Sequence, residues 1–190
     1  MTNKSPWVAP LNKLSASLRP IVTMQEKHFG AVLNPTRWWG RSPYLFWLIA
    51  LFVGFLERRR AKIDAVTRSL VMTRVSQRCC CAFCIDANSL RLAERSGSMD
   101  KVLAVANWPQ ETLFSERERA VLAYADAMTA TPPAIGDELK ATLKTHFDDK
   151  AITELTALIA FQNLSARFNA ALDIPAQGLC VPNGGEKRNV

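Results

Sequence analysis

Glycine and alternating polar–apolar segments, the usual marks of sheet proteins, are scarce in this sequence. It has 8 glycines among 190 residues, and no stretch between turn-forming residues sustains the every-second-residue pattern of a strand. Alanine and leucine, which have high helix propensity, are frequent instead. At 48% hydrophobic and 22% charged residues, the chain can bury a sizeable core. We therefore expect an all-α protein.

A long apolar run is missing as well. The longest uncharged apolar run covers residues 44–56, interrupted only by Gly54, and it is well short of the ~20 residues that a membrane-spanning helix needs. Residues 1–20 contain no apolar stretch of the kind that a signal peptide carries. The five cysteines are an odd number in a chain too long to depend on a disulfide scaffold. We expect no membrane span and a cytoplasmic location, where thiols are kept reduced.

Acidic residues are outnumbered by basic ones. Lys and Arg total 24 against 17 Asp and Glu, which gives a net charge of +7, and the whole excess lies in the first half of the chain, because the second half is slightly acidic. No zinc-finger, basic-zipper or RNA-binding signature accompanies this charge. We interpret it as a solvated basic surface and expect no nucleic-acid partner.

Residues that begin and end helices are frequent. Asp64, Ser98 and Ser115 can each cap a helix, and Glu118 completes a capping box with Ser115. The pattern predicts seven to eight helices, at about residues 21–29, 43–58, 65–78, 82–96, 98–108, 116–131, 135–146 and 149–172. The last is apolar nearly all round and should be buried. We assign an N-terminal arm to residues 1–20, a single helical domain to 21–175 and a flexible tail to 176–190.

Four of the five cysteines lie together, at positions 79, 80, 81 and 84. If a helix begins near residue 82, Cys84 lies in its first turn, where free backbone amides and the helix dipole favour a thiolate. The spacing lets Cys81 reach Cys84 and convert a sulfenic acid there into a disulfide. Two alternatives stay open on spacing alone. In the first, the cysteines are simply small buried residues without a chemical role. In the second, they bind a metal together with Cys180, His28 or His146.

Several spaced motifs resemble one protein family. Val75-Ser76-Gln77 ahead of Cys81-Ala82-Phe83-Cys84-Ile85-Asp86 is similar to the core of the alkylhydroperoxidase D and carboxymuconolactone decarboxylase family. Further similar segments, which together span about residues 20–175, are Asn34-Pro35, Pro43, Ser115-Glu116-Arg117-Glu118-Arg119-Ala120, Tyr124-Ala125, Glu154-Leu155-Thr156, Asn163, Arg167 and Asn169. The resemblance implies a compact all-α bundle that assembles into oligomers and has peroxidase or disulfide-reductase activity.

The resemblance also shows where this chain departs from the family. In alkylhydroperoxidase D, a Glu twelve residues before the first motif cysteine and a His four residues after the second form a proton relay; these positions are Ser69 and Asn88 here. Neither side chain takes up a proton near neutral pH, although both can form hydrogen bonds. The candidate catalytic residues are therefore Cys84, Cys81, Asn88 and Ser69, and we assign no cofactor and no metal.

The leading hypothesis is an antioxidant peroxidase. It acts on a hydroperoxide or disulfide substrate, is recycled by an unidentified thiol reductant and forms a homo-oligomer (dimer, trimer or hexamer). The alternatives are a carboxymuconolactone decarboxylase-like enzyme and a non-catalytic redox sensor. Arg167 should pair with Glu154 or bind a substrate anion, because an unpaired buried Arg is costly. Trp38, Trp39 and Trp47 should fill the core or a subunit interface.

Overall fold

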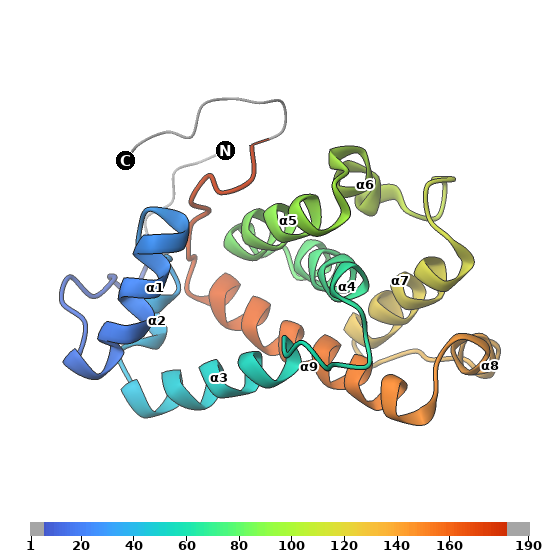
Figure 1. Cartoon of the computed structure of the whole chain (residues 1–190), viewed down its shortest axis with the longest axis horizontal. Coiled ribbons are helices and arrows are strands. Elements are labelled where there is room, and N and C mark those ends of the chain that lie inside the picture. Colours follow the sequence, from blue (N-terminus) through green and yellow to red (C-terminus); the bar gives the residue numbers. More distant parts are fainter. Residues whose placement is uncertain (1–5, 182–190) are drawn as a thin grey trace.

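The computed structural model describes residues 6–181, and Figure 1 shows that this part of the chain is built from helices. The α-helices are α1 (Arg19–Phe29), α2 (Thr36–Trp39), α3 (Pro43–Leu56), α4 (Ala65–Arg78), α5 (Ala82–Ser96), α6 (Met99–Ala104), α7 (Glu116–Thr129), α8 (Asp137–His146) and α9 (Asp149–Ala171). Two 3-10 helices, η1 (Ala16–Leu18) and η2 (Val105–Asn107), accompany them. No strand occurs in this described part, so the all-α prediction is confirmed. The additional helix is the short α2.

Capping side chains fix where the helices begin. The Asp64 carboxylate accepts the Thr67 N–H at the start of α4, and the Ser98 hydroxyl caps α6. At the start of α7, Ser115 and Glu118 form both bonds of a capping box. All three predicted caps are therefore confirmed. Each satisfies backbone N–H groups that the first turn of a helix leaves without a partner.

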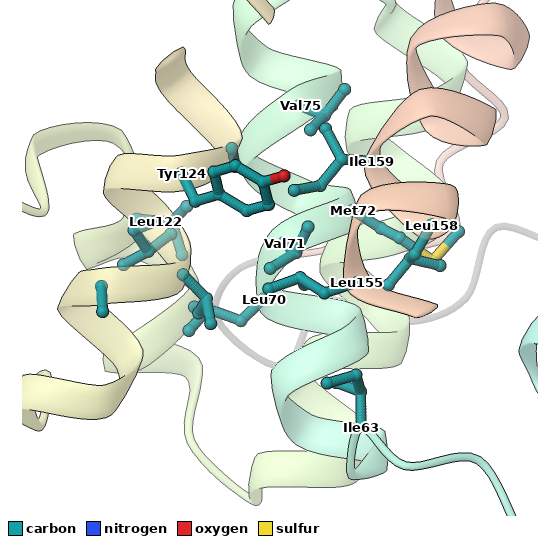
Figure 2. Packing of buried hydrophobic residues seen from close by; sticks show 14 of the residues in the cluster. Ile63, Leu70, Val71, Met72, Val75, Leu122, Tyr124, Leu155, Leu158 and Ile159 are labelled. Atoms are coloured by element: carbon teal, nitrogen blue, oxygen red, sulfur yellow. The ribbon is translucent and has the colours of Figure 1, made fainter. Parts of the chain in front are cut away.

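Helix α4 forms the centre of the main core, with α7 on one side and α9 on the other (Figure 2). The fully buried side chains in this cluster include Leu70, Val71 and Val75 of α4, Leu122 of α7, and Leu155 and Ile159 of α9. Helix α9 is not buried all round, contrary to the prediction, because Leu164 is 49% exposed. Its apolar residues still hold α4 in place, and α4 leads directly into the cysteine cluster.

The segments before α1 and after α9 both pack on the bundle. The Trp7 indole N–H donates to the Ala171 carbonyl at 2.8 Å, and the Trp38 indole N–H donates to the Val8 carbonyl at 2.8 Å. After α9, the chain passes between α1–α2 and α5 (Figure 1). The Gln177 side chain there joins residues 32–34 by accepting the Asn34 N–H and donating to the Val32 carbonyl. Positions 182–190 of the predicted tail lie outside the described residues.

Helix α3 carries an apolar stripe that no other element within residues 6–181 covers. Its large exposed side chains are Tyr44, Leu48, Leu51 and Phe55, which are 88%, 67%, 68% and 52% exposed. They recur at the spacing of one helix face. None of the helices within residues 6–181 is both long enough and apolar enough to cross a membrane.

Candidate functional site

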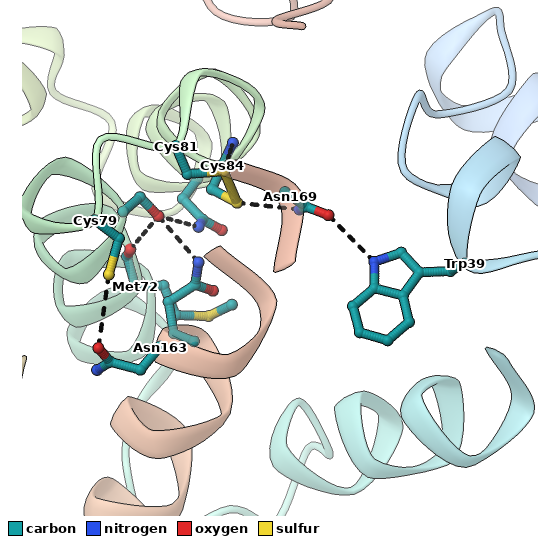
Figure 3. The surroundings of a disulfide bond; sticks show 10 residues. Trp39, Met72, Cys79, Cys81, Cys84, Asn163 and Asn169 are labelled. Carbon is teal, nitrogen blue, oxygen red and sulfur yellow. Dashed lines mark hydrogen bonds between the residues drawn. A yellow bond between two sulfur atoms is a disulfide. The ribbon is translucent and has the colours of Figure 1, made fainter. Parts of the chain in front are cut away.

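The cysteine pair lies where α4 gives way to α5. Cys80, in the left-handed region at φ 52°, reverses the chain direction between the two helices. Cys81 is then the N-cap of α5, and its sulfur accepts the Cys84 N–H at 3.2 Å. A disulfide joins Cys81 to Cys84, with their Cα atoms 5.2 Å apart (Figure 3). The predicted spacing at a helix start therefore does bring the two sulfurs together.

The hydrogen-bond donor to the Cys84 sulfur differs from the prediction, which assigned it to the backbone amides at the start of the helix. Cys84 does lie in the first turn of α5. Its own backbone N–H, however, donates a hydrogen bond to the Cys81 sulfur. Cys84 instead receives its hydrogen bond from a side chain of α9: the Asn169 Nδ2 atom lies 3.3 Å from the Cys84 sulfur (Figure 3). Each sulfur thus has its own N–H donor, one from the backbone and one from an amide side chain.

Both cysteines are buried, at 1% exposure for Cys81 and 4% for Cys84. The side chains packed around them are mostly apolar: Trp38, Phe83, Ala166 and Ile174, with Val8, Leu33 and Leu179 at the edge. A wide cleft of about 720 Å³ lies elsewhere, between α7 and α8, and neither motif cysteine lines it. The two sulfurs are thus shielded by the side chains packed around them.

Asn88 belongs to a buried hydrogen-bond network centred on Ser76. The Ser76 hydroxyl accepts the Asn88 amide at 2.9 Å and the Gln162 amide at 3.1 Å, and it donates to the Met72 carbonyl at 2.6 Å. The Ser76 carbonyl in turn accepts the Cys81 N–H at 3.1 Å. Asn88 is therefore connected to the backbone of the motif through one serine, and its amide donates to that serine rather than to a sulfur.

Ser69 lies in a different environment. Its hydroxyl is 2.9 Å from an Arg95 nitrogen, and Arg95 pairs with Glu57 at 2.7 Å. Burial raises the pKa of Glu57, but the hydrogen bond and charge of Arg95 and the charges of Arg91 and Arg68 outweigh it, so the pKa lies below 4.5. The hydrogen bonds of Ser69 connect it to this charged cluster and not to the cysteines.

Two further cysteines contact polar groups near the motif. The Cys79 thiol lies 3.6 Å from the Asn163 side-chain oxygen. Burial raises the pKa of Cys79, although the neighbouring Arg167 guanidinium acts in the opposite direction. Burial also raises the pKa of Cys180, and the charge of Asp86 adds to the effect. Within residues 6–181, no three His, Cys, Asp or Glu side chains converge as metal ligands would.

The predicted ion pair between Arg167 and Glu154 is wrong. Arg167 donates to the Thr129 carbonyl and the Thr131 hydroxyl. Glu154 instead pairs with Arg58 and accepts the backbone N–H of Lys62 at 2.8 Å. The partners of Glu154 therefore lie in the loop after α3, whereas the prediction placed its partner on the same helix, α9.

Asn169 and Trp39 are the site residues that the sequence reasoning did not assign. Asn169 is 2% exposed, and its side-chain oxygen accepts the Trp39 indole N–H at 3.2 Å. Asn169 did belong to the resemblance, but without a role. The feature of the sequence that could have identified Asn169 is an amide side chain on a largely apolar helix, because a buried amide needs hydrogen-bond partners.

Comparison with known proteins agrees with the motifs. The model of the "Carboxymuconolactone decarboxylase family" matches residues 43–127. The uncharacterized protein YnjA of Escherichia coli K12 is 56% identical over 181 residues, which cover 95% of this chain and 98% of that protein.

Two solved structures share the fold. The apo debrominase Bmp8 has a TM-score of 0.80 at 23% identity, over 91% of this chain and 93% of that one. The alkylhydroperoxidase AhpD core protein from Ralstonia eutropha JMP134, an uncharacterized peroxidase-related protein, has a TM-score of 0.79 at 18% identity, over 92% and 97%. At these identities the likeness establishes the alkylhydroperoxidase D-like helical fold and leaves the chemistry to the site itself.

Proposed function

This chain belongs to the carboxymuconolactone decarboxylase family, and on that premise we propose that it is a thiol-dependent peroxidase that reduces hydroperoxides. One observation carries the proposal. Cys81 and Cys84 lie at disulfide-bonding distance at the start of α5, each with an N–H donor on its sulfur. Hydrogen bonds of this kind favour the thiolate, which is the form that attacks peroxides and disulfides.

In the proposed reaction, the Cys84 thiolate attacks the terminal oxygen of a hydroperoxide. An S–O bond forms, the O–O bond breaks, and the alkoxide leaves as the alcohol after it takes up a proton. The Cys81 sulfur then attacks the Cys84 sulfenic acid, forming the S–S bond and releasing water. Two thiols are thus oxidised while one hydroperoxide is reduced to an alcohol and water. A thiol reductant restores the pair by disulfide exchange.

We assign Asn88 and Ser69 supporting roles, because neither exchanges a proton near neutral pH. Asn88 acts through Ser76 on the Cys81 backbone, whereas Ser69 anchors Arg95. General acid–base catalysis typically contributes about 10²–10⁴-fold to a rate. We therefore expect slower turnover than in family members that keep the Glu and His relay.

The test uses fully reduced protein and cumene hydroperoxide. Wild type should consume two thiols per chain and turn over when dithiothreitol is supplied. Cys84→Ser should abolish turnover, whereas Cys81→Ser should stop at a sulfenic acid that dimedone labels. Cys80→Ser is the matched control, because this thiol is exposed and outside the pair. Full activity in Cys84→Ser, or sulfenic acid on Cys81 instead, would overturn the assignment.

The burial of both sulfurs favours a second candidate, a redox sensor without turnover. A sensor would be oxidised once per chain and would change its oligomeric state, and dithiothreitol would not sustain peroxide consumption. Decarboxylase-like activity is the other alternative in this family. Such activity would survive alkylation of every thiol, which peroxidase activity would not.

We also propose that this protein is a cytoplasmic homo-oligomer that self-associates through α3. The exposed stripe of α3 contains no charged side chain. An uncharged apolar face is complementary to itself across a two-fold axis, so a second copy of the chain is a suitable partner.

A further inference from the structure

The Asn169 side chain is held in one orientation between two partners. The Trp39 indole nitrogen can only donate a hydrogen bond, so the atom that faces it must be the Asn169 oxygen. The Asn169 NH₂ group consequently faces Cys84, where it lies 3.3 Å from the sulfur (Figure 3). The indole N–H therefore fixes the amide orientation, because the oxygen and nitrogen of an amide are otherwise interchangeable in shape.

Trp39 is itself fixed by packing. Its ring stacks on Phe168, with ring centroids 3.7 Å apart and planes at 25°, and it is 8% exposed. The Asn169 backbone is fixed too, because its carbonyl accepts the Ile174 N–H at 3.0 Å. The donor at Cys84 is therefore preorganised by contacts on both its side chain and its backbone.

We propose that Asn169 is a catalytic residue that stabilises the Cys84 thiolate by hydrogen bonding, and that Trp39 is the positioning residue that aims the amide. The inference rests on the proposed role of Cys84 as nucleophile. The same NH₂ group stabilises Cys84 when this sulfur becomes the leaving group during reduction of the disulfide. In both steps the amide donates a hydrogen bond and keeps its proton, so this stabilisation of the sulfur does not itself depend on an acid–base residue.

Charged groups on the surrounding elements have other partners. The charged residues that directly neighbour, in sequence, the residues packed around the cysteine pair are Arg37, Arg78, Asp86, Arg167 and Asp173. The first four make hydrogen bonds or ion pairs with groups other than the sulfurs of the pair. The neutral amide of Asn169 is thus the side-chain donor that the structure provides to Cys84.

The experiment measures the pKa of the Cys84 thiol, from the iodoacetamide rate against pH. In a background of Cys79→Ser, Cys80→Ser, Cys81→Ser and Cys180→Ser, Cys84 is the sole thiol, and serine at position 81 remains a good N-cap. Asn169→Leu keeps the size of the side chain but removes the donor. It should raise the Cys84 pKa by about one unit, a roughly tenfold loss of thiolate at neutral pH.

Trp39→Phe keeps a ring on Phe168 but removes the indole N–H, and it should raise the pKa by about half a unit as the amide loses its fixed orientation. Asn163→Leu is the matched control, because this Asn lies on the same helix but contacts Cys79 and Thr129; the Cys84 pKa should not change.

An unchanged pKa in folded Asn169→Leu overturns the role of Asn169. If that variant does not fold, an unchanged pKa in Trp39→Phe overturns the proposal as a whole. The assay contains no peroxide, so its result is separate from turnover. A raised pKa without peroxidase activity in wild type would reject the proposed function and leave Asn169 as the donor that stabilises the Cys84 thiolate.

Discussion

The Asp86 carboxylate accepts a hydrogen bond from the backbone N–H of Cys180 at 2.7 Å, across 94 residues of sequence. Its other oxygen accepts the Gln177 N–H at 2.8 Å. Asp86 follows Cys84 by two residues on α5, so one carboxylate joins the start of the motif helix to residues 174–181. Ile174 and Leu179 of that segment pack on the cysteine pair, and the segment therefore covers the sulfurs.

Asp86→Ala should expose Cys84. The substitution removes both hydrogen bonds to the covering segment, and bonds to a charged group stabilise by about 1.5–3 kcal/mol each. We expect Cys84 in reduced protein to react about tenfold faster with iodoacetamide, as measured by mass spectrometry of the labelled peptide. Asp86→Asn should be intermediate, since one acceptor oxygen remains.

Asp137→Ala is the control for this prediction. Asp137 is an exposed carboxylate that pairs with Lys140 on α8, so its loss should leave the rate unchanged. If Cys84 reacts at the wild-type rate in both Asp86 variants, the segment at 174–181 does not limit access and another element covers the sulfurs.

Ser76→Ala should destabilise the fold. The Ser76 hydroxyl is the acceptor for the Asn88 and Gln162 amides, and removing it leaves two buried donors without that partner. We expect a loss of about 3 kcal/mol in the free energy of unfolding, measured by urea denaturation. Ser96→Ala is the matched control, because its hydroxyl also donates to the carbonyl four residues earlier, but it accepts the half-buried backbone N–H of Ser98 instead of two buried side-chain amides. Equal losses in the two variants would show that the network contributes little.

The local features of this site could be predicted from the sequence. The caps at Asp64, Ser98 and Ser115 depend on residues within one helical turn, and so does the meeting of Cys81 with Cys84. Contacts of this range follow from the geometry of a helix start, which a sequence pattern encodes directly.

The long-range features could not be predicted in this way. The hydrogen bond from Trp39 to Asn169 joins residues 130 positions apart, and helical periodicity contains no information about which distant polar atoms meet. The same limit explains the error at Arg167. A buried arginine requires partners, but whether these are carboxylates or carbonyls depends on loop paths, here those of residues 129–131.

The Glu57 carboxylate should make stability depend on pH below about 4.5. Because its folded pKa lies below the ordinary value of 4.5, the unfolded chain binds a proton first as the pH falls, and stability is lost. The contribution is complete above the unfolded pKa. Wild type should therefore lose stability more steeply than Glu57→Gln when thermal unfolding is followed from pH 7 down to about pH 3.

Asp137→Asn provides the comparison for Glu57, because the Asp137 pKa is lowered mainly by a hydrogen bond with Lys140 at an exposed site. Its removal should change the pH profile little, since exposed pairs contribute little to stability. Parallel profiles for wild type and Glu57→Gln would contradict the coupling of Glu57 to Arg95.

The stripe on α3 should hold copies of the chain together. Leu51→Glu places a charge among Tyr44, Leu48 and Phe55 and should dissociate the oligomer into monomers of 21.1 kDa, as measured by light scattering after gel filtration. Leu103→Glu is the matched control: this leucine is also exposed, at 58%, but lies on α6 away from the stripe. Monomeric wild type, or an oligomer that survives Leu51→Glu, would contradict self-association through α3. Because Leu51 is exposed in the single chain, the monomeric variant should keep its fold, which would separate loss of assembly from loss of the cysteine site.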